Sequence, residues 1–129
     1  MTTPGAALHL LQGLRSAVRE EVWVLLLDAR HRLISVDPVV AGSLNSARLL
    51  PRDVLAPALR AGAAALIVAH NHPSGEVTPS RADRLVTAAL RDASRLVGLP
   101  MLDHLIVTAR SHYSFRETEA WETETATAA

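Results

Sequence analysis

The feature that most restricts the fold is the apolar segment at residues 63–69, AAALIVA, which contains no polar side chain. A strand that is apolar on both faces needs cover on both faces, as in a sheet between two layers of helices. Residues 22–28, VWVLLLD, form a second apolar run. Hydrophobic residues make up 49% of the chain and aromatic residues only 3%, so these layers must pack through Ala, Val, Leu and Ile.

The rest of the sequence alternates between helical and extended patterns. Apolar residues three and four positions apart predict helices at 4–18, 53–61 and 80–97, and Pro57 is expected to confine the second to its later turns. Short apolar runs bounded by turn residues predict the strands, at 22–28, 32–36, 39–45, 63–69, 102–108 and 113–115. This order indicates an α/β (α+β) fold, a mixed β-sheet flanked by helices.

The length of 129 residues leaves room for one domain, which we expect at residues 1–117. Residues 118–129 are acidic, rich in Thr and without apolar periodicity, so we expect a disordered tail there. No segment approaches the roughly 20 apolar residues of a membrane span, and the N-terminus lacks the pattern of a signal peptide. The sequence therefore predicts a cytoplasmic protein with no membrane partner.

Charge and cysteine content exclude several functions. Thirteen basic residues balance thirteen acidic residues, and a net charge of zero leaves no surplus for a phosphate backbone. We therefore expect no strong direct binding of nucleic acid by this domain. The absence of Cys excludes disulfides, thiolate nucleophiles and the Cys-ligated zinc of nucleobase deaminases, so any bound metal must be held by His and carboxylates.

Two histidines lie where the strand at 63–69 ends. His70 and His72 are two residues apart, and side chains alternate along a strand. Both imidazoles are therefore expected on one side, with Asn71 on the other. Alone, a pair of histidines near a turn is more often solvated or hydrogen-bonded to backbone than bound to metal.

A carboxylate follows at the start of the helix at 80–97. Ser80 occupies the N-cap position, and Asp83 heads a row with Val86, Leu90 and Val97 that otherwise faces the core. An ionised carboxylate that faces the core costs free energy of folding unless a cation lies close to it. Ser80 and Asp83 also form an ordinary capping box, and the two roles are compatible.

Two neutral imidazoles and one carboxylate are the ligand set of an open catalytic zinc site. We therefore predict that His70, His72 and Asp83 bind Zn²⁺. Such a site needs a general base, and Glu21 could supply it if the strand at 22–28 lies beside the strand at 63–69. Glu20 is the alternative, because only one of these neighbours can point toward the site.

The spacing His70-x-His72-Pro73-x6-Ser80-x-x-Asp83 resembles the JAMM motif of JAB/MPN-domain metallopeptidases. The segments HNHPSGEVTPSRAD, LDHLIV and YSFRE resemble the RadC-type branch of that superfamily. The resemblance runs from about Glu21 to about residue 117. It implies a JAB/MPN fold and a zinc-dependent peptidase or isopeptidase, in which Glu21 activates the water and Ser80 helps to stabilise the oxyanion.

The same resemblance says little about the substrate. Full-length RadC-type proteins carry a helix-hairpin-helix region, whereas only one helix is expected before Glu21 here. The chain also has no room for the insertions with which eukaryotic JAMM deubiquitinases grip ubiquitin. We therefore expect only a substrate class, a peptide or a ubiquitin-like protein conjugate. Two other functions are possible alternatives to hydrolysis: a DNA-repair or recombination factor without peptidase activity, and a non-catalytic MPN scaffold.

One further histidine, His104, is expected to be structural or to support the metal site from behind.

Overall fold

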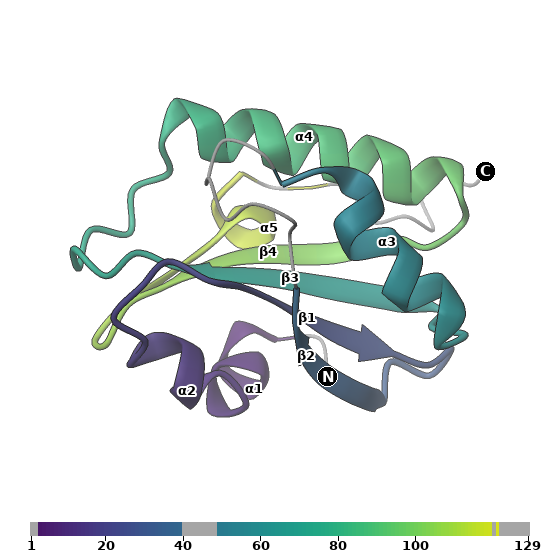
Figure 1. Ribbon diagram of the computed structural model, residues 1–129, viewed down its shortest axis with the longest axis horizontal. Helices are drawn as coiled ribbons and strands as arrows, with labels where there is room; N and C mark the ends of the chain where they lie inside the picture. The colour runs from purple at the N-terminus through teal and green to yellow at the C-terminus, as the bar shows by residue number, and fades with distance from the viewer. Residues whose placement is uncertain (1–2, 40–48, 120, 122–129) are drawn as a thin grey trace.

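The computed structural model describes residues 3–39, 49–119 and 121. Its centre is a five-stranded sheet in the order β2-β1-β3-β4-β5. Helices α1 and α2 lie on one side of this sheet, and α3 and α4 lie on the other (Figure 1). The predicted fold class is therefore confirmed. The strands are β1 (Val22–Leu27), β2 (Leu33–Pro38), β3 (Ala65–Asn71), β4 (Met101–Val107) and β5 (His112–Ser114), and the helices are α1 (Pro4–His9), α2 (Gln12–Arg15), α3 (Pro51–Arg60), α4 (Arg81–Leu96) and α5 (Phe115–Thr118).

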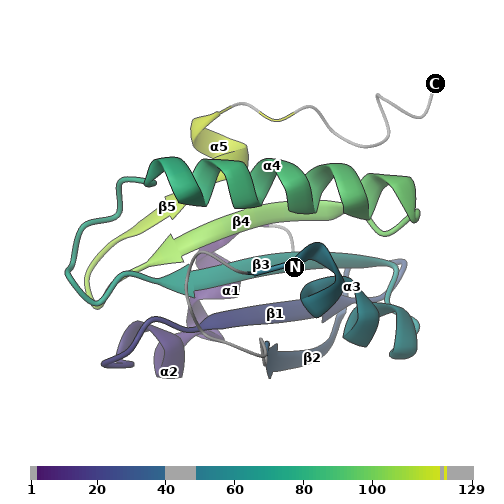
Figure 2. The ribbon, with the colours of Figure 1, turned by 45° about the horizontal axis from the view of Figure 1, so that its top comes forward.

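The sheet is mixed, as predicted. Strand β1 pairs antiparallel with both β2 and β3, and β4 pairs antiparallel with β5. Strands β3 and β4 are parallel, and α4 connects them across one face of the sheet (Figure 2). The carboxyl ends of β3 and β4 consequently lie at the same edge, close to the beginning of α4.

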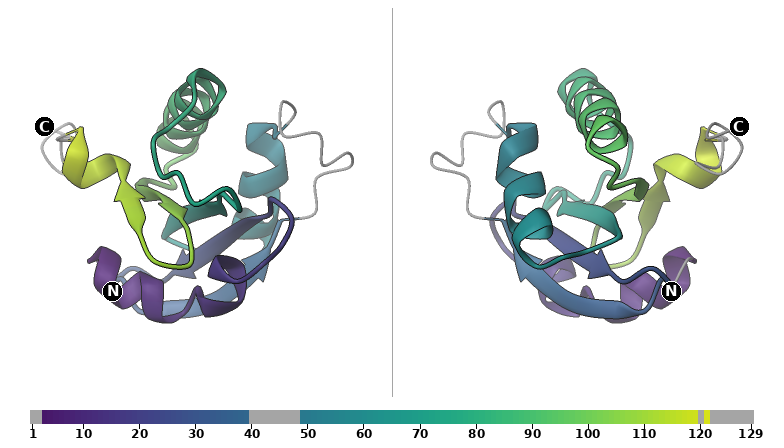
Figure 3. Two further views of the ribbon diagram at one scale, coloured as in Figure 1. Left: turned by 90° about the vertical axis from the view of Figure 1, so that its left-hand side faces the viewer. Right: turned by 90° about the vertical axis from the view of Figure 1, so that its right-hand side faces the viewer.

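The sheet separates two apolar cores, which explains why its central strands are apolar on both faces. Val24 and Leu26 of β1 belong to the core under α3 and α4. Leu25 and Leu27 belong to the core between the opposite face of the sheet and helices α1 and α2. The end-on views in Figure 3 show these helices on opposite sides of the twisted sheet.

Two predicted helices differ from the structure. The helix expected at 4–18 is two short helices, α1 and α2, with a break at Leu10 and Leu11. Gly13 of α2 lies over Trp23, where a Cβ atom would come within 2.9 Å of the ring. Helix α3 begins at Pro51 and continues through Pro57, so the restriction expected at Pro57 is wrong. Packing of its buried residues on both sides of the proline offsets the lost backbone hydrogen bond.

Helix α4 begins and ends where the sequence predicts. Ser80 is its N-cap, and Gly98 follows its C-terminus with a φ of 73°. Val86 and Leu90 pack into the core, as expected of the row that Asp83 heads. Val97 does not, because it is the C-cap residue and is 49% exposed.

The boundary expected at 117 falls inside α5. Glu119 forms an ion pair with Arg84 of α4, and Trp121 lies with its ring 4.2 Å from the guanidinium carbon of Arg91. The packed part of the chain therefore reaches at least Trp121. The remainder of the predicted tail lies outside the described residues, as does the strand predicted at 39–45 apart from Val39, which follows β2.

Candidate metal centre

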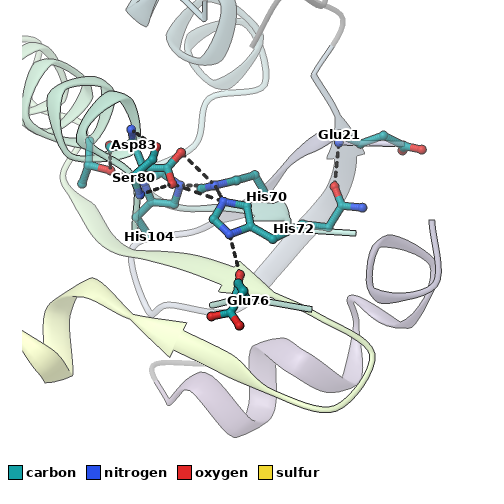
Figure 4. A network of polar contacts seen from close by, with 9 residues as sticks. Glu21, His70, His72, Glu76, Ser80, Asp83 and His104 are labelled. Carbon is teal, nitrogen blue, oxygen red and sulfur yellow. Dashed lines mark hydrogen bonds and ion pairs between the residues drawn. The ribbon is translucent and has the colours of Figure 1, made fainter. Parts of the chain in front are cut away.

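The two predicted histidines meet at the end of β3. His70 is the penultimate residue of the strand and His72 follows it, and their Nε2 atoms lie 3.1 Å apart (Figure 4). The Asn71 side chain points to the opposite side. It accepts a hydrogen bond from the backbone of Glu21 and donates to the carbonyl of Arg19. Asn71 thus fastens the segment before β1, and the alternation predicted for these residues is confirmed.

Asp83 completes the group from the first turn of α4. Its carboxylate oxygens lie 3.3 Å from Nε2 of His70 and 3.2 Å from Nε2 of His72. One of the same oxygens accepts a hydrogen bond of 2.8 Å from the backbone N–H of Ser80, and the Ser80 hydroxyl accepts one from the N–H of Asp83. The capping box therefore fixes the carboxylate in the direction of the histidines.

The environment of Asp83 favours its ionised form. Burial raises the pKa of this carboxyl, but the adjacent imidazole of His70 and the backbone N–H of Ser80 lower it more, so that the net pKa lies well below the usual value. A carboxylate that is ionised at every physiological pH is suited to hold a cation.

The hydrogen bonds behind the two imidazoles show that their Nε2 atoms are suited to a metal. Nδ1 of His72 lies 2.7 Å from the carbonyl oxygen of Glu76, which can only accept, so this nitrogen carries the proton. In a neutral ring, Nε2 of His72 then presents a lone pair. Nδ1 of His70 is likewise engaged, at 2.8 Å from Nε2 of His104.

The spacing of these atoms also fits a metal ion. Ligand atoms bound tetrahedrally to zinc at roughly 2.0–2.1 Å lie about 3.3 Å from one another. The Nε2 atoms of His70 and His72 lie 3.1 Å apart, and each faces a different carboxylate oxygen of Asp83, at 3.3 Å from His70 and 3.2 Å from His72. Lone pairs this close repel each other unless a cation or a proton lies between them, so the residues present fit a metal.

The carboxylate that joins this group from the segment before β1 belongs to Glu20, not to Glu21. The ligand atoms of Glu20, His70, His72 and Asp83 all lie within 4.8 Å of one another. Glu21 points away from this group (Figure 4), and its carboxylate accepts a hydrogen bond from the indole of Trp23. The position expected of Glu21 is therefore corrected, and the alternative residue Glu20 occupies it.

The pairing of β1 with β3 explains this outcome. Val22 lies opposite His70, and paired residues of neighbouring strands point to the same face. Glu20, two residues before Val22, continues that face. Glu21 lies opposite Asn71 and points to the other face. Because β1 is apolar on both faces, its sequence contains no alternation from which this could be predicted.

Ser80 lies beside the cluster with one hydrogen left to donate. Its oxygen accepts from the backbone N–H of Asp83, and among the described residues its hydroxyl proton has no acceptor. Ser80 is exposed. The predicted residue is thus placed at the cluster, and its hydroxyl can donate to a group that approaches from solvent.

Asp103 and His104 are buried ionisable residues of β4, and His104 lies directly behind His70. Burial lowers the pKa of His104 well below its ordinary value, and the neighbouring His70 adds to this effect, so the ring is neutral. Burial raises the pKa of Asp103, whose carboxylate accepts hydrogen bonds from the Ser114 hydroxyl and from the backbone of Arg116. Asp103 thereby anchors α5, and Phe115 of α5 stacks on the His104 ring.

A cavity of about 670 Å³ adjoins the cluster, and His72 and Pro73 form part of its wall. Its other walls come from the end of α2 and from the turn between β4 and β5. Among the described residues that line it, Arg15 and Arg110 are cationic and none carries a carboxylate. Neither arginine forms an ion pair within the described part of the chain.

The fold and the cluster together define the class of this protein. A mixed sheet between helices, with two histidines at the carboxyl end of a central strand and a carboxylate at the start of the following helix, is a JAB/MPN-type domain with a possible metal site. Residues 1–120 match the family model of the RadC-like JAB domain, and the chain belongs to this family.

The chain is similar to bacterial proteins of the name UPF0758. It is 48% identical over 118 residues to a UPF0758 protein of Burkholderia mallei, covering 89% of this chain and 42% of that protein. It is 46% identical over 110 residues to one of Haemophilus influenzae, covering 85% and 50% of the two chains. The chain therefore spans about half the length of the curated relatives it matches. Among the described residues, no helix has the length and apolar character needed to cross a membrane.

Proposed function

We propose that this chain is a zinc-dependent hydrolase of the JAMM metallopeptidase type, which cleaves a peptide or isopeptide bond. The observation that carries the proposal is the convergence of Glu20, His70, His72 and Asp83 within 4.8 Å. His70, His72 and Asp83 would hold the metal. Zinc bound there would supply Lewis-acid chemistry, acidifying water and polarising a carbonyl group.

Glu20 is the general base of this proposal, in place of Glu21. Its carboxylate is exposed to solvent, so it can reach both a water molecule and a substrate. It takes a proton from the attacking water and delivers that proton to the departing amine. Asp83 cannot do this, because its lowered pKa makes it a weak base and Ser80 occupies one of its oxygens.

Ser80 is the proposed oxyanion donor. Its hydroxyl proton is free for a carbonyl oxygen that gains negative charge as water attacks. Its oxygen is held by the backbone N–H of Asp83, so the direction of donation is set before a substrate binds. Loss of one such donor typically reduces the rate by a factor on the order of 10² to 10³.

The substrate class follows from the cavity beside His72. Its volume of about 670 Å³ can hold several residues of an extended peptide next to the cluster. Arg15 and Arg110 in its wall favour a substrate with carboxylate groups near the cleaved bond. The zero net charge of the chain supports our expectation of weak, salt-sensitive contact with nucleic acid at most.

The decisive experiment measures bound zinc and hydrolysis in the same preparations. The wild-type chain is expected to hold about one zinc per molecule and to cleave a member of a panel of peptides and ubiquitin-like conjugates. His70→Ala, His72→Ala and Asp83→Ala should each lose most of the zinc. His112→Ala is the control, because His112 is an exposed histidine outside the cluster, and this variant should keep its zinc. Wild-type zinc content in all three cluster variants would remove the metal site from the proposal.

A second outcome separates the metal site from catalysis. If the chain binds zinc through these residues but cleaves nothing in the panel, while Glu20→Gln leaves zinc binding unchanged, the hydrolase proposal is contradicted and a non-catalytic domain is favoured. Submicromolar binding of labelled DNA at near-physiological salt would instead favour a repair-associated role.

A further inference from the structure

The strongest unexplained feature is a line of buried polar side chains behind His70. Nδ1 of His70 lies 2.8 Å from Nε2 of His104, and Nδ1 of His104 lies 2.6 Å from the hydroxyl oxygen of Thr87. The Thr87 hydroxyl lies 2.7 Å from the carbonyl oxygen of Asp83, within α4. We call His70, His104, Thr87 and this carbonyl the His104 network. Neither the proposed base nor the proposed oxyanion donor needs it.

The carbonyl oxygen at the end of the network determines every proton within it. A carbonyl can only accept, so Thr87 must donate its single hydroxyl proton to Asp83. The Thr87 oxygen is then an acceptor toward His104, and Nδ1 of His104 must carry a proton. In the neutral ring Nε2 of His104 has a lone pair, so Nδ1 of His70 must carry the proton that joins them.

The consequence reaches the candidate metal centre. A neutral His70 with its proton on Nδ1 has a lone pair on Nε2, the atom that faces His72 and Asp83. His72 reaches the same state by a different contact, since its Nδ1 donates to the carbonyl of Glu76. Both rings are thus held by a backbone carbonyl, one directly and one through two side chains.

We propose that His104 and Thr87 are positioning residues that hold His70 in the Nδ1–H form, so that its Nε2 lone pair is available to the metal. His104 is 2% exposed and Thr87 is 3% exposed, so water does not compete for these hydrogen bonds. Phe115 stacks on the His104 ring with centroids 5.0 Å apart and fixes its plane. This inference rests on the proposed zinc site but not on hydrolysis.

The first test reads the positions of the protons directly in the metal-free 129-residue chain. Long-range ¹H–¹⁵N correlation spectra at pH 8 distinguish the two neutral forms of each labelled histidine. In the wild type, His70 and His104 are both expected as the Nδ1–H form. His104→Leu removes the acceptor of His70, which should then shift toward the Nε2–H form, with a proton where the metal would bind. Finding His70 as Nε2–H in the wild type would overturn the proposal.

The second test measures zinc affinity by competition with a chelator. His104→Leu is expected to weaken zinc binding by about 10- to 100-fold, the usual effect of removing a partner of a metal-binding histidine. Thr87→Val keeps the shape of the side chain without its hydroxyl and should weaken binding in the same direction. It also keeps the test decisive if His104→Leu does not fold.

Two further variants distinguish positioning from simple stability. His104→Gln offers an amide oxygen to His70 and an amide N–H to Thr87, and should restore most of the zinc affinity. Ser94→Ala removes another buried hydroxyl of α4, outside the network, and should leave zinc affinity unchanged. Wild-type affinity in both His104→Leu and Thr87→Val would overturn the proposal. A wild-type chain without zinc affinity would contradict the proposed function instead, while the spectra would still decide the proton positions.

Discussion

The backbone N–H of Glu21 donates a hydrogen bond of 2.6 Å to the side-chain oxygen of Asn71, on the face of the sheet opposite to His70. This contact holds the segment before β1 in register with the end of β3. It also determines which of two adjacent glutamates reaches the candidate metal centre, and Glu20 is the one.

Exchange of each glutamate for glutamine tests this assignment. Glu20→Gln is expected to lower the rate of hydrolysis by about 10² to 10⁴, because it removes the general base. Zinc content should stay close to that of the wild type, because His70, His72 and Asp83 remain. Glu21→Gln is the matched control and should keep nearly all activity, measured on the same substrate. Greater loss in Glu21→Gln than in Glu20→Gln would return the role to Glu21.

Acid should destabilise the metal-free protein in part through His104. Burial lowers the pKa of this histidine in the folded state, whereas in the unfolded chain it is near 6.5. Below that pH the unfolded chain binds the additional proton, so stability present above about pH 6.5 is lost as the pH falls. One such group contributes at most about 1.4 kcal/mol per pH unit.

Urea unfolding between pH 7.5 and 5.5, with chelator present, measures this effect. His104→Gln has no titratable ring, so its free energy of unfolding should fall less steeply with pH than that of the wild type. Equal slopes for the two proteins would mean that His104 is not the buried neutral histidine described here.

Trp121 should contribute to stability although it lies beyond the predicted domain boundary. Its ring packs on Phe115, at a centroid distance of 6.3 Å, and on the guanidinium of Arg91. Trp121→Ala is expected to lower the free energy of unfolding by about 1–2 kcal/mol. Trp121→Phe keeps an aromatic ring and should lose less. Thermal or urea unfolding measures these differences. If Trp121→Ala has the same free energy of unfolding as the wild type, the domain boundary predicted at residue 117 is supported.

Arg110 should favour acidic substrates. Arg110→Glu reverses an exposed charge in the wall of the cavity beside His72. We expect this variant to raise KM for peptides with acidic residues near the cleaved bond by about 3- to 10-fold, with kcat little changed. The effect is modest because an exposed ion pair between Arg110 and the substrate contributes little binding free energy. Arg60→Glu makes the same change of charge at the end of α3, outside the cavity, and should leave KM unchanged. Equal effects of both variants would point to net charge alone.

The local chemistry of the cluster could be predicted from the sequence. Alternation along a strand places His70 and His72 on one side whatever the rest of the fold does. The capping box likewise joins Ser80 to Asp83 over a single helical turn. These relationships span two or three residues, so covalent geometry and backbone hydrogen bonding decide them. The layered α+β fold followed from the doubly apolar strands, because such strands must be covered on both faces.

Longer-range relationships were decided only by the tertiary structure. Glu20 and Glu21 are equivalent in sequence until the register of β1 against β3 assigns them to opposite faces, and the apolar pattern of β1 does not encode that register. His104 lies 34 residues from His70 and meets it only because β3 and β4 pair in parallel. Pro57 stays inside α3 because packing against the sheet outweighs its local preference. Local rules determine which side chains can form the cluster, and strand pairing determines which of them reach it.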